Sequence, residues 1–217
     1  MWDQDEHGGT SFRVSGWRLH IECQAARIRL AMTHDSSSEV AGSISLVGCN
    51  LPPVTESFVR GDELHLMMPQ TDGASAGIEL ALLIVQANQD FLVMESTLAI
   101  HTQWLDAHPL VELLLPGEDA NASFIQNSAR VFSRLQERSK TQNGEPTVSL
   151  LIDERDWHSI DESGMKLGSI RFFGEFMEKG VIRKAQPWWV WSNTGPDPIR
   201  IRGLAAELAN RPLPLTS

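Results

Sequence analysis

The sequence has few of the features that identify an enzyme or a membrane protein. It contains no glycine-rich phosphate-binding motif, no G-x-S-x-G nucleophile motif and no H-E-x-x-H zinc motif. No apolar run approaches the roughly 18 residues of a transmembrane helix. The acidic start MWDQDEHGGT lacks the basic and apolar regions of a signal peptide. We therefore expect a soluble, cytoplasmic protein that has no cofactor and no membrane partner.

Cysteine is scarce as well, since Cys23 and Cys49 are the only two. Neither lies in a C-x-x-C pair, a spacing common in zinc and redox sites. One disulfide would be compatible with two cysteines, but two reduced thiols are favoured in a chain without a secretion signal. Cys23 falls on the apolar parity of its predicted strand, which predicts a buried, unreactive thiol.

Basic residues are outnumbered by acidic ones. The chain has 18 Lys and Arg against 28 Asp and Glu, a formal net charge of -10 and a pI near 5.1. A polyanionic surface repels the phosphate backbone of nucleic acids. The basic cluster at residues 130–140 is interrupted by Glu137 and is typical of a solvated helix face. The composition predicts an acidic protein without a nucleic-acid partner.

Most of the chain shows the period-2 alternation of β-strands. Its 217 residues, 41% hydrophobic and 21% charged, are enough to bury a sizeable core. Turn residues separate the strand-like segments, and no alternating βα pattern is visible. The sequence therefore predicts a mainly β protein, a single antiparallel β-sandwich over residues 11–217 after a flexible tail at 1–10. The predicted strands cover residues 11–23, 25–32, 40–47, 56–68, 78–86, 91–106, 110–115 and 147–152.

Two segments in the C-terminal half have the character of helices. Within residues 118–140, Phe124 and Val131 recur at the spacing that places side chains on one helix face. Near the end of the chain, Asp197 and Pro198 have the character of an N-cap and a first helical residue. The sequence predicts one or two helices in this half. The apolar face of the last one would carry Ile201, Leu204 and Leu208.

Residues 168–191 form the best-defined stretch of the sequence. Two runs with strand alternation flank a turn at Gly180, which can supply the positive φ of a tight turn. Parity places Trp189 and Trp191 on one face of the second run and Trp188 on the other. We therefore predict a long β-hairpin that is apolar on both faces and covered on both sides.

Histidines recur on the polar faces of the predicted strands. His20, His65 and His101 all take this parity, each with a glutamate two or six residues away, as Glu95 is from His101. If the strands share one sheet, this face could transfer protons on a sugar or bind a divalent metal. A wet sheet surface is the simpler interpretation, since perturbed sites are rarer. These four residues are the candidate catalytic groups.

Two further pairs are candidate ligand-binding residues. Asp106 and His108 share parity near a predicted strand end, although Pro109 marks a turn there and explains both residues without a ligand. Trp189 and Trp191 could form a platform for sugar rings, but packing in the core or at a subunit contact explains them equally well. No cluster has the spacing of a zinc site, so we predict no metal.

Two segments resemble a known group of proteins. They are FMEKGVIRKA at residues 176–185 and RPLPLT at residues 211–216. Both resemble elements of uncharacterised bacterial proteins with a large antiparallel β-sandwich, whose outline is similar to the sugar-mutarotase supersandwich. The resemblance covers about the last third of the chain and implies a supersandwich-like fold without an activity. Mutarotase-type enzymes use histidines with a carboxylate on a concave sheet face, but their motif has no residue-by-residue match here.

The sequence favours a non-catalytic binding or assembly module with a carbohydrate or protein partner, and it leaves the oligomeric state open. The alternative is a carbohydrate-active enzyme, similar to a mutarotase or epimerase, that uses the histidines and glutamates of a sheet face. Such an enzyme requires at least two of His20, His65 and His101 in one concave pocket, within about the width of a substrate.

Overall fold

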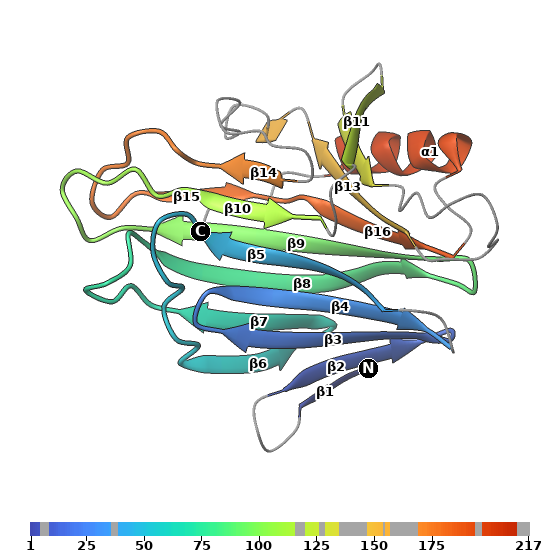
Figure 1. Ribbon diagram of the computed structural model, residues 1–217, viewed down its shortest axis with the longest axis horizontal. Coiled ribbons are helices and arrows are strands. Elements are labelled where there is room, and N and C mark those ends of the chain that lie inside the picture. Colours follow the sequence, from blue (N-terminus) through green and yellow to red (C-terminus); the bar gives the residue numbers. More distant parts are fainter. Residues whose placement is uncertain are drawn as a thin grey trace.

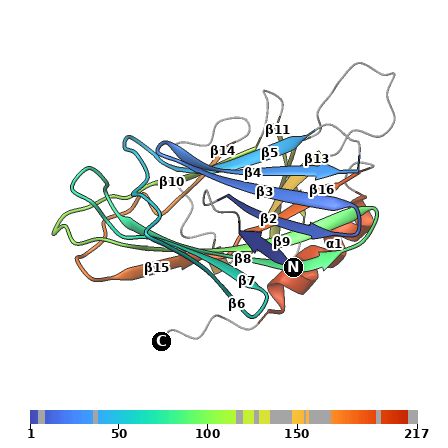
Figure 2. The ribbon, with the colours of Figure 1, turned by 90° about the horizontal axis from the view of Figure 1, so that it is seen from below.

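The computed structural model describes residues 1–4, 9–35, 39–115, 120–125, 129–134, 147–153, 155–156, 169–193 and 197–211. Strands dominate these residues and form two antiparallel sheets that lie face to face as two layers (Figures 1 and 2). The prediction of a mainly β protein with an antiparallel sandwich is therefore confirmed. A helix near the C-terminal end of the described chain completes the fold.

The first sheet is built largely from the N-terminal part of the chain. It has seven strands, and each neighbouring pair is antiparallel. Their order is β1 (Trp2–Gln4), β2 (Thr10–Val14), β3 (Trp17–Gln24), β4 (Arg27–His34), β5 (Val40–Leu46), β10 (Val111–Leu114) and β14 (Ser169–Phe172).

The second sheet has nine strands and includes the two longest ones. Eight of them follow the order β11 (Ala120–Ile125), β12 (Ala129–Arg134), β13 (Thr147–Asp153), β16 (Trp188–Ser192), β9 (Phe91–His101), β8 (Gly77–Ala87), β7 (Glu63–Met68) and β6 (Glu56–Arg60). The ninth strand, β15 (Ile182–Ala185), pairs with the end of β9 beyond β16. Both β8 and β9 have a paired strand on each side and are therefore central in this sheet.

The main core lies between the inner faces of the two sheets. Alternation along the strands supplies it, since residues two apart share a face. In β7, for example, Leu64, Leu66 and Met68 are buried, while Glu63 and His65 are only partly covered. The single strand predicted over residues 56–68 is divided into β6 and β7 by a turn at Gly61, where φ is 62°.

The N-terminal segment does not match the flexible tail predicted at residues 1–10. Trp2 lies in β1, and its ring packs against Phe12 with 5.0 Å between the ring centroids. The indole Nε1 donates a hydrogen bond of 2.9 Å to the carbonyl oxygen of Asp62, which belongs to the opposite sheet's β6–β7 turn. One large side chain therefore ties a polar segment to the sandwich, a contact that composition does not reveal.

The predicted helix over residues 118–140 is wrong where the structure describes this segment. Ala120–Ile125 and Ala129–Arg134 are instead the antiparallel strands β11 and β12, and β12 pairs in turn with β13. Residues 135–140 lie outside the described part. The helical spacing of apolar residues is a local signal, and pairing with a distant strand overrides it.

The predicted hairpin over residues 168–191 is also wrong. Its first run becomes β14, which pairs with β10 in the seven-stranded sheet, and its second run becomes β15 and β16 in the opposite sheet. The turn at Gly180 exists, with φ of 82°, but the chain crosses between the layers before reaching it. Phe173, at the beginning of this crossing, has a positive φ of 77°.

The last helix agrees with its prediction. The helix α1 (Pro198–Ala209) begins after the N-cap Asp197, whose side chain accepts a hydrogen bond from the backbone nitrogen of Ile199. It covers the outer face of the nine-stranded sheet and forms a second apolar cluster there. The helix contributes Ile201, Leu204 and Leu208, and the sheet contributes Phe91, Val93, Leu151, Trp188 and Val190.

Two further features concern cysteine and membrane spans. Cys23 and Cys49 are free thiols. Cys23 lies opposite the buried Ile28, but its position near the end of β3 leaves it exposed, so its predicted burial is wrong. Among the helical residues that the structure describes, no segment is long and apolar enough to span a bilayer.

Candidate interaction surface at the loop end

The three candidate histidines do not all lie in the same sheet. His20 lies on β3 of the seven-stranded sheet, and its Nε2 is 3.7 Å from the carboxylate of Glu22. Glu22 also pairs with Arg29 at 3.3 Å, so this imidazole borders a surface ion-pair network. His65 and His101 lie on β7 and β9 of the nine-stranded sheet. All three histidines were predicted on the polar faces of their strands, but the structure does not bring them together in one site.

His65 and His101 are also separated within their own sheet. His65 pairs across the sheet with Ala81, and Ala81 pairs with Thr97, four residues before His101. The two imidazoles are therefore two strands apart and offset by four positions. His65 stacks on Phe58 with 5.0 Å between ring centroids and lies 3.2 Å from the carboxylate of Glu63.

Glu95 has a role in packing the end of the helix onto the sheet. Its buried carboxylate accepts a hydrogen bond of 2.9 Å from Nε1 of Trp188 and pairs with the guanidinium of Arg211, just beyond α1. Burial lowers the pKa of Arg211, and the charge of Glu63 opposes this effect. Through its contacts with Trp188 and Arg211, Glu95 links the strand to the end of the helix.

The two candidate platform tryptophans are core residues. Trp189 and Trp191 are each 0% exposed, and their rings stack between the sheets with 5.9 Å between centroids. Nε1 of Trp189 donates a 3.0 Å hydrogen bond to the hydroxyl of Ser96. Trp188 faces α1 on the other side of the sheet. The predicted division of the tryptophans between two faces is confirmed, and packing is the role that the structure shows for them.

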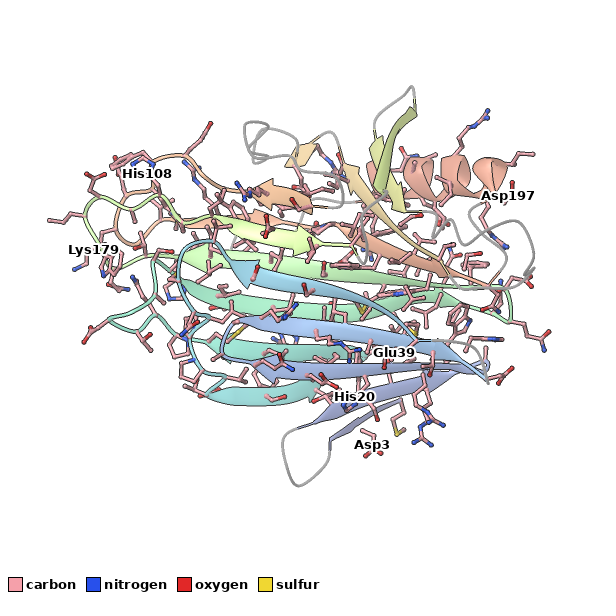
Figure 3. The ribbon with its side chains drawn as sticks, in the orientation of Figure 1. Asp3, His20, Glu39, His108, Lys179 and Asp197 are labelled. Atoms are coloured by element: carbon pink, nitrogen blue, oxygen red, sulfur yellow. The ribbon has the colours of Figure 1, made fainter. Side chains whose placement is uncertain are left out.

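Asp106 and His108 lie close together in an exposed loop. The carboxylate of Asp106 is 3.6 Å from Nε2 of His108, and both side chains are largely exposed. The ring of His108 lies 6.0 Å from that of Phe176, which belongs to a loop distant in sequence. Figure 3 places His108 and Lys179 together at one end of the molecule and Asp197 at the opposite end.

These residues belong to a surface formed by two loops, residues 102–110 and 173–182, which we call the loop end. A backbone bridge joins Ala107 to Met177, and the nitrogen of Gly180 donates a 3.0 Å hydrogen bond to the carbonyl oxygen of Thr102. Ala107 and Met177 are buried beneath it. The loops extend from the same end of the sandwich (Figure 1), and their mutual hydrogen bonds hold the surface in one arrangement.

Large apolar side chains project from the loop end into solvent. Leu105 is 82% exposed and Ile182 is 58% exposed, although both are residues that usually lie in a core. The exposed apolar residues of the loop end are Trp104, Leu105, Phe176, Val181 and Ile182. Scattered exposed apolar residues need no explanation, but a group of them on one surface marks a site of interaction.

The charges around this apolar group are balanced. Within the loop end, Asp106, Glu175 and Glu178 carry negative charge and Lys179 carries positive charge, and Arg183 and Lys184 follow directly on β15. The guanidinium of Arg183 lies 3.3 Å from the carboxylate of Glu175 and donates a 2.9 Å hydrogen bond to the carbonyl oxygen of Phe176. An apolar centre with a charged, partly paired rim is the usual anatomy of a protein interface.

Sequence reasoning identified two polar members of the loop end but missed its apolar centre. The predicted strand over residues 91–106 included Trp104, whereas β9 ends at His101 and the indole is exposed. Ile182 was placed within the hairpin. The available signal was Pro109, which indicated a turn and therefore exposed neighbours.

No protein-family model matches the chain, and neither a curated protein nor a solved structure matches it. The resemblance to sandwich proteins with a mutarotase-like outline stays a prediction. Of the segment at residues 211–216, only Arg211 lies within the described chain. Among the described residues, no group of three or more His, Cys, Asp or Glu side chains has an arrangement that could hold a metal ion.

Proposed function

We propose that the protein is a non-catalytic assembly module in which two copies of the chain join through their loop ends. The observation that carries the proposal is the exposure of Trp104, Leu105, Phe176, Val181 and Ile182 in the two segments that meet at the loop end. Covering these side chains removes apolar area from water, which is the main driving force of protein association.

The charge balance of the loop end favours a second copy over a lipid surface. With as many carboxylates as basic groups, this region has no excess of positive charge to attract an anionic membrane, and entering a bilayer would desolvate the charges of both signs. In a two-fold pair, each copy can place Lys179 opposite a carboxylate such as Asp106 or Glu178 of the other. The presence of both signs of charge on one surface is compatible with such a self-complementary contact.

The distribution of the histidines supports the non-catalytic proposal over a carbohydrate-active enzyme. His20 is on the other sheet from His65 and His101, and the latter two are separated by two strands and four positions. The carboxylate of Glu95 is paired with Trp188 and Arg211. No pair of these groups is arranged to act together on one sugar.

Sedimentation equilibrium of the full chain over a range of concentrations tests the proposal. We expect a reversible dimer for the wild type and an association about a thousandfold weaker for the double variant Leu105→Asp/Ile182→Asp, because each of the two buried apolar anchors contributes about 2 kcal/mol. Ile199→Asp is the matched control, since Ile199 is 78% exposed and lies on α1. A wild type that stays monomeric, or a control that dissociates equally, would overturn the proposal.

A further inference from the structure

A second surface feature lies at the opposite end of the sandwich from the loop end, around the turn between β2 and β3 (Figure 1). A hollow of about 520 Å³ opens there, and an adjoining one of about 570 Å³ shares part of its wall. We call the two together the hairpin hollow. Its polar lining is formed by Arg13, Ser15, Arg18, Thr33, His34 and Asp35.

Two arginines stand side by side on one wall of the hairpin hollow. Arg13 and Arg18 are directly opposite each other in the β2–β3 pairing, and Thr33 is opposite Arg18 on β4. All three therefore share the outer face of the sheet. Like charges in directly opposite positions destabilise a sheet. Among the described residues, neither guanidinium has an ion pair, although other arginines of this sheet, such as Arg29 and Arg171, do.

The backbone around the hairpin hollow is held in unusual conformations. Ser15 has φ of 49° and Asp35 has φ of 46°, both in the left-handed region that side chains other than glycine rarely adopt. The nitrogen of Asp35 donates a 3.0 Å hydrogen bond to the carbonyl oxygen of Gly16, which joins the two turns. The positive φ values of Ser15 and Gly16 belong to the two-residue turn that joins β2 to β3, and this turn fixes one border of the hollow.

Gly16 makes room for the polar groups of the hollow. A Cβ at this position would lie 2.9 Å from Nε2 of His34 and 3.0 Å from a carboxylate oxygen of Asp35. Two neighbours hold the imidazole of His34 in place. Nδ2 of Asn193 lies 3.1 Å from its Nδ1, and the ring packs against Trp17. Arg13 and Arg18 line one of the two adjoining hollows and His34 lines the other, while the exposed carboxylate of Asp35 borders both.

We propose that the hairpin hollow binds an acidic saccharide, a sugar that carries a carboxylate or a phosphate. Arg13 and Arg18 hold the anionic group through charge-assisted hydrogen bonds, which offsets their mutual repulsion. Asp35 accepts hydrogen bonds from sugar hydroxyls. Ser15 and Thr33, whose side chains carry hydroxyls, line the same hollow as Asp35 and the two arginines. Because Asp35 repels a bare anion, the site selects ligands that combine negative charge with hydroxyl groups.

Isothermal titration calorimetry of the full chain tests this proposal with D-glucuronate, glucose 6-phosphate, glucose and inorganic phosphate. We expect saturable binding of at least one of the two acidic sugars, and at least tenfold weaker binding of glucose and of inorganic phosphate. Comparing glucuronate with glucose 6-phosphate identifies the preferred anionic group. No saturable binding of either acidic sugar would overturn the proposal, as would glucose or inorganic phosphate binding equally well.

Variants connect the binding to the named residues. Arg13→Gln and Arg18→Gln should each weaken acidic-sugar binding at least tenfold, while the melting temperature stays the same or rises because the repulsion is relieved. Asp35→Asn should weaken acidic-sugar binding but strengthen binding of inorganic phosphate. The matched control is Arg27→Gln, an exposed arginine on the same sheet outside the hollow. Equal loss in Arg27→Gln, or unchanged binding in both arginine variants, would contradict the assignment.

Discussion

At the scale of single residues, the alternation along a strand predicted which face carries a given side chain. It did not predict equally well which other side chains lie next to it. The sequence separated Trp188 from Trp189 and Trp191, and the structure buries them in two different clusters. The same reasoning could not show that His20 belongs to a different sheet from His65. A face is a property of one strand, whereas a site depends on strand order, which is decided by contacts between residues far apart in sequence.

Gly42 shows how closely the two sheets approach each other. It lies on β5, and a Cβ there would be 2.3 Å from Cζ3 of Trp189 in the opposite sheet. We expect Gly42→Ala to lower the free energy of unfolding by about 1–3 kcal/mol, because the fully buried indole has no space to move into. Urea unfolding followed by tryptophan fluorescence measures the change. A variant as stable as the wild type would show that the sheets can separate at this point without cost.

At the scale of elements, strands with clear alternation and a capped helix were predictable, and connections between sheets were not. The segments of β7, β8 and β13 were located from their apolar patterns, and α1 from Asp197 and Pro198. Residues 120–125 and 129–134 were mistaken for part of a helix because their apolar spacing fits both structures. The stretch at 168–191 was mistaken for a hairpin because nothing local indicates that β14 and β15 belong to opposite layers.

The helix α1 provides a test at this scale through Gly203. This glycine lies within the helix, and a Cβ there would meet no atom within 4 Å. We expect Gly203→Ala to raise the free energy of unfolding by up to about 1 kcal/mol, the usual difference in helix propensity. Chemical denaturation monitored by circular dichroism measures this. Asp197→Ala gives the opposite comparison, because removing the N-cap should lower the free energy of unfolding by about 1 kcal/mol. A Gly203→Ala variant less stable than the wild type would mean that the helix requires the glycine.

At the scale of the whole molecule, the sandwich has two ends with different surfaces. The loop end presents apolar side chains with a balanced rim of charge, and the hairpin hollow presents paired arginines in a chain of net charge -10. Because the two lie at opposite ends of the strands, binding at one leaves the other accessible (Figure 1). The net charge predicted no nucleic-acid partner but could not reveal either local surface, since each is assembled from segments distant in sequence.

The most direct test of assembly through the loop end is cross-linking of a mixture of isotopically light and heavy chains with a lysine-reactive reagent. Lys179 is exposed at the loop end and lies there together with His108 (Figure 3). We predict that mass spectrometry will find cross-links between Lys179 of a light chain and Lys179 or Lys184 of a heavy chain, and that Leu105→Asp will abolish them. Mixed cross-links that survive Leu105→Asp, or their absence at concentrations where the protein sediments as a dimer, would contradict the account.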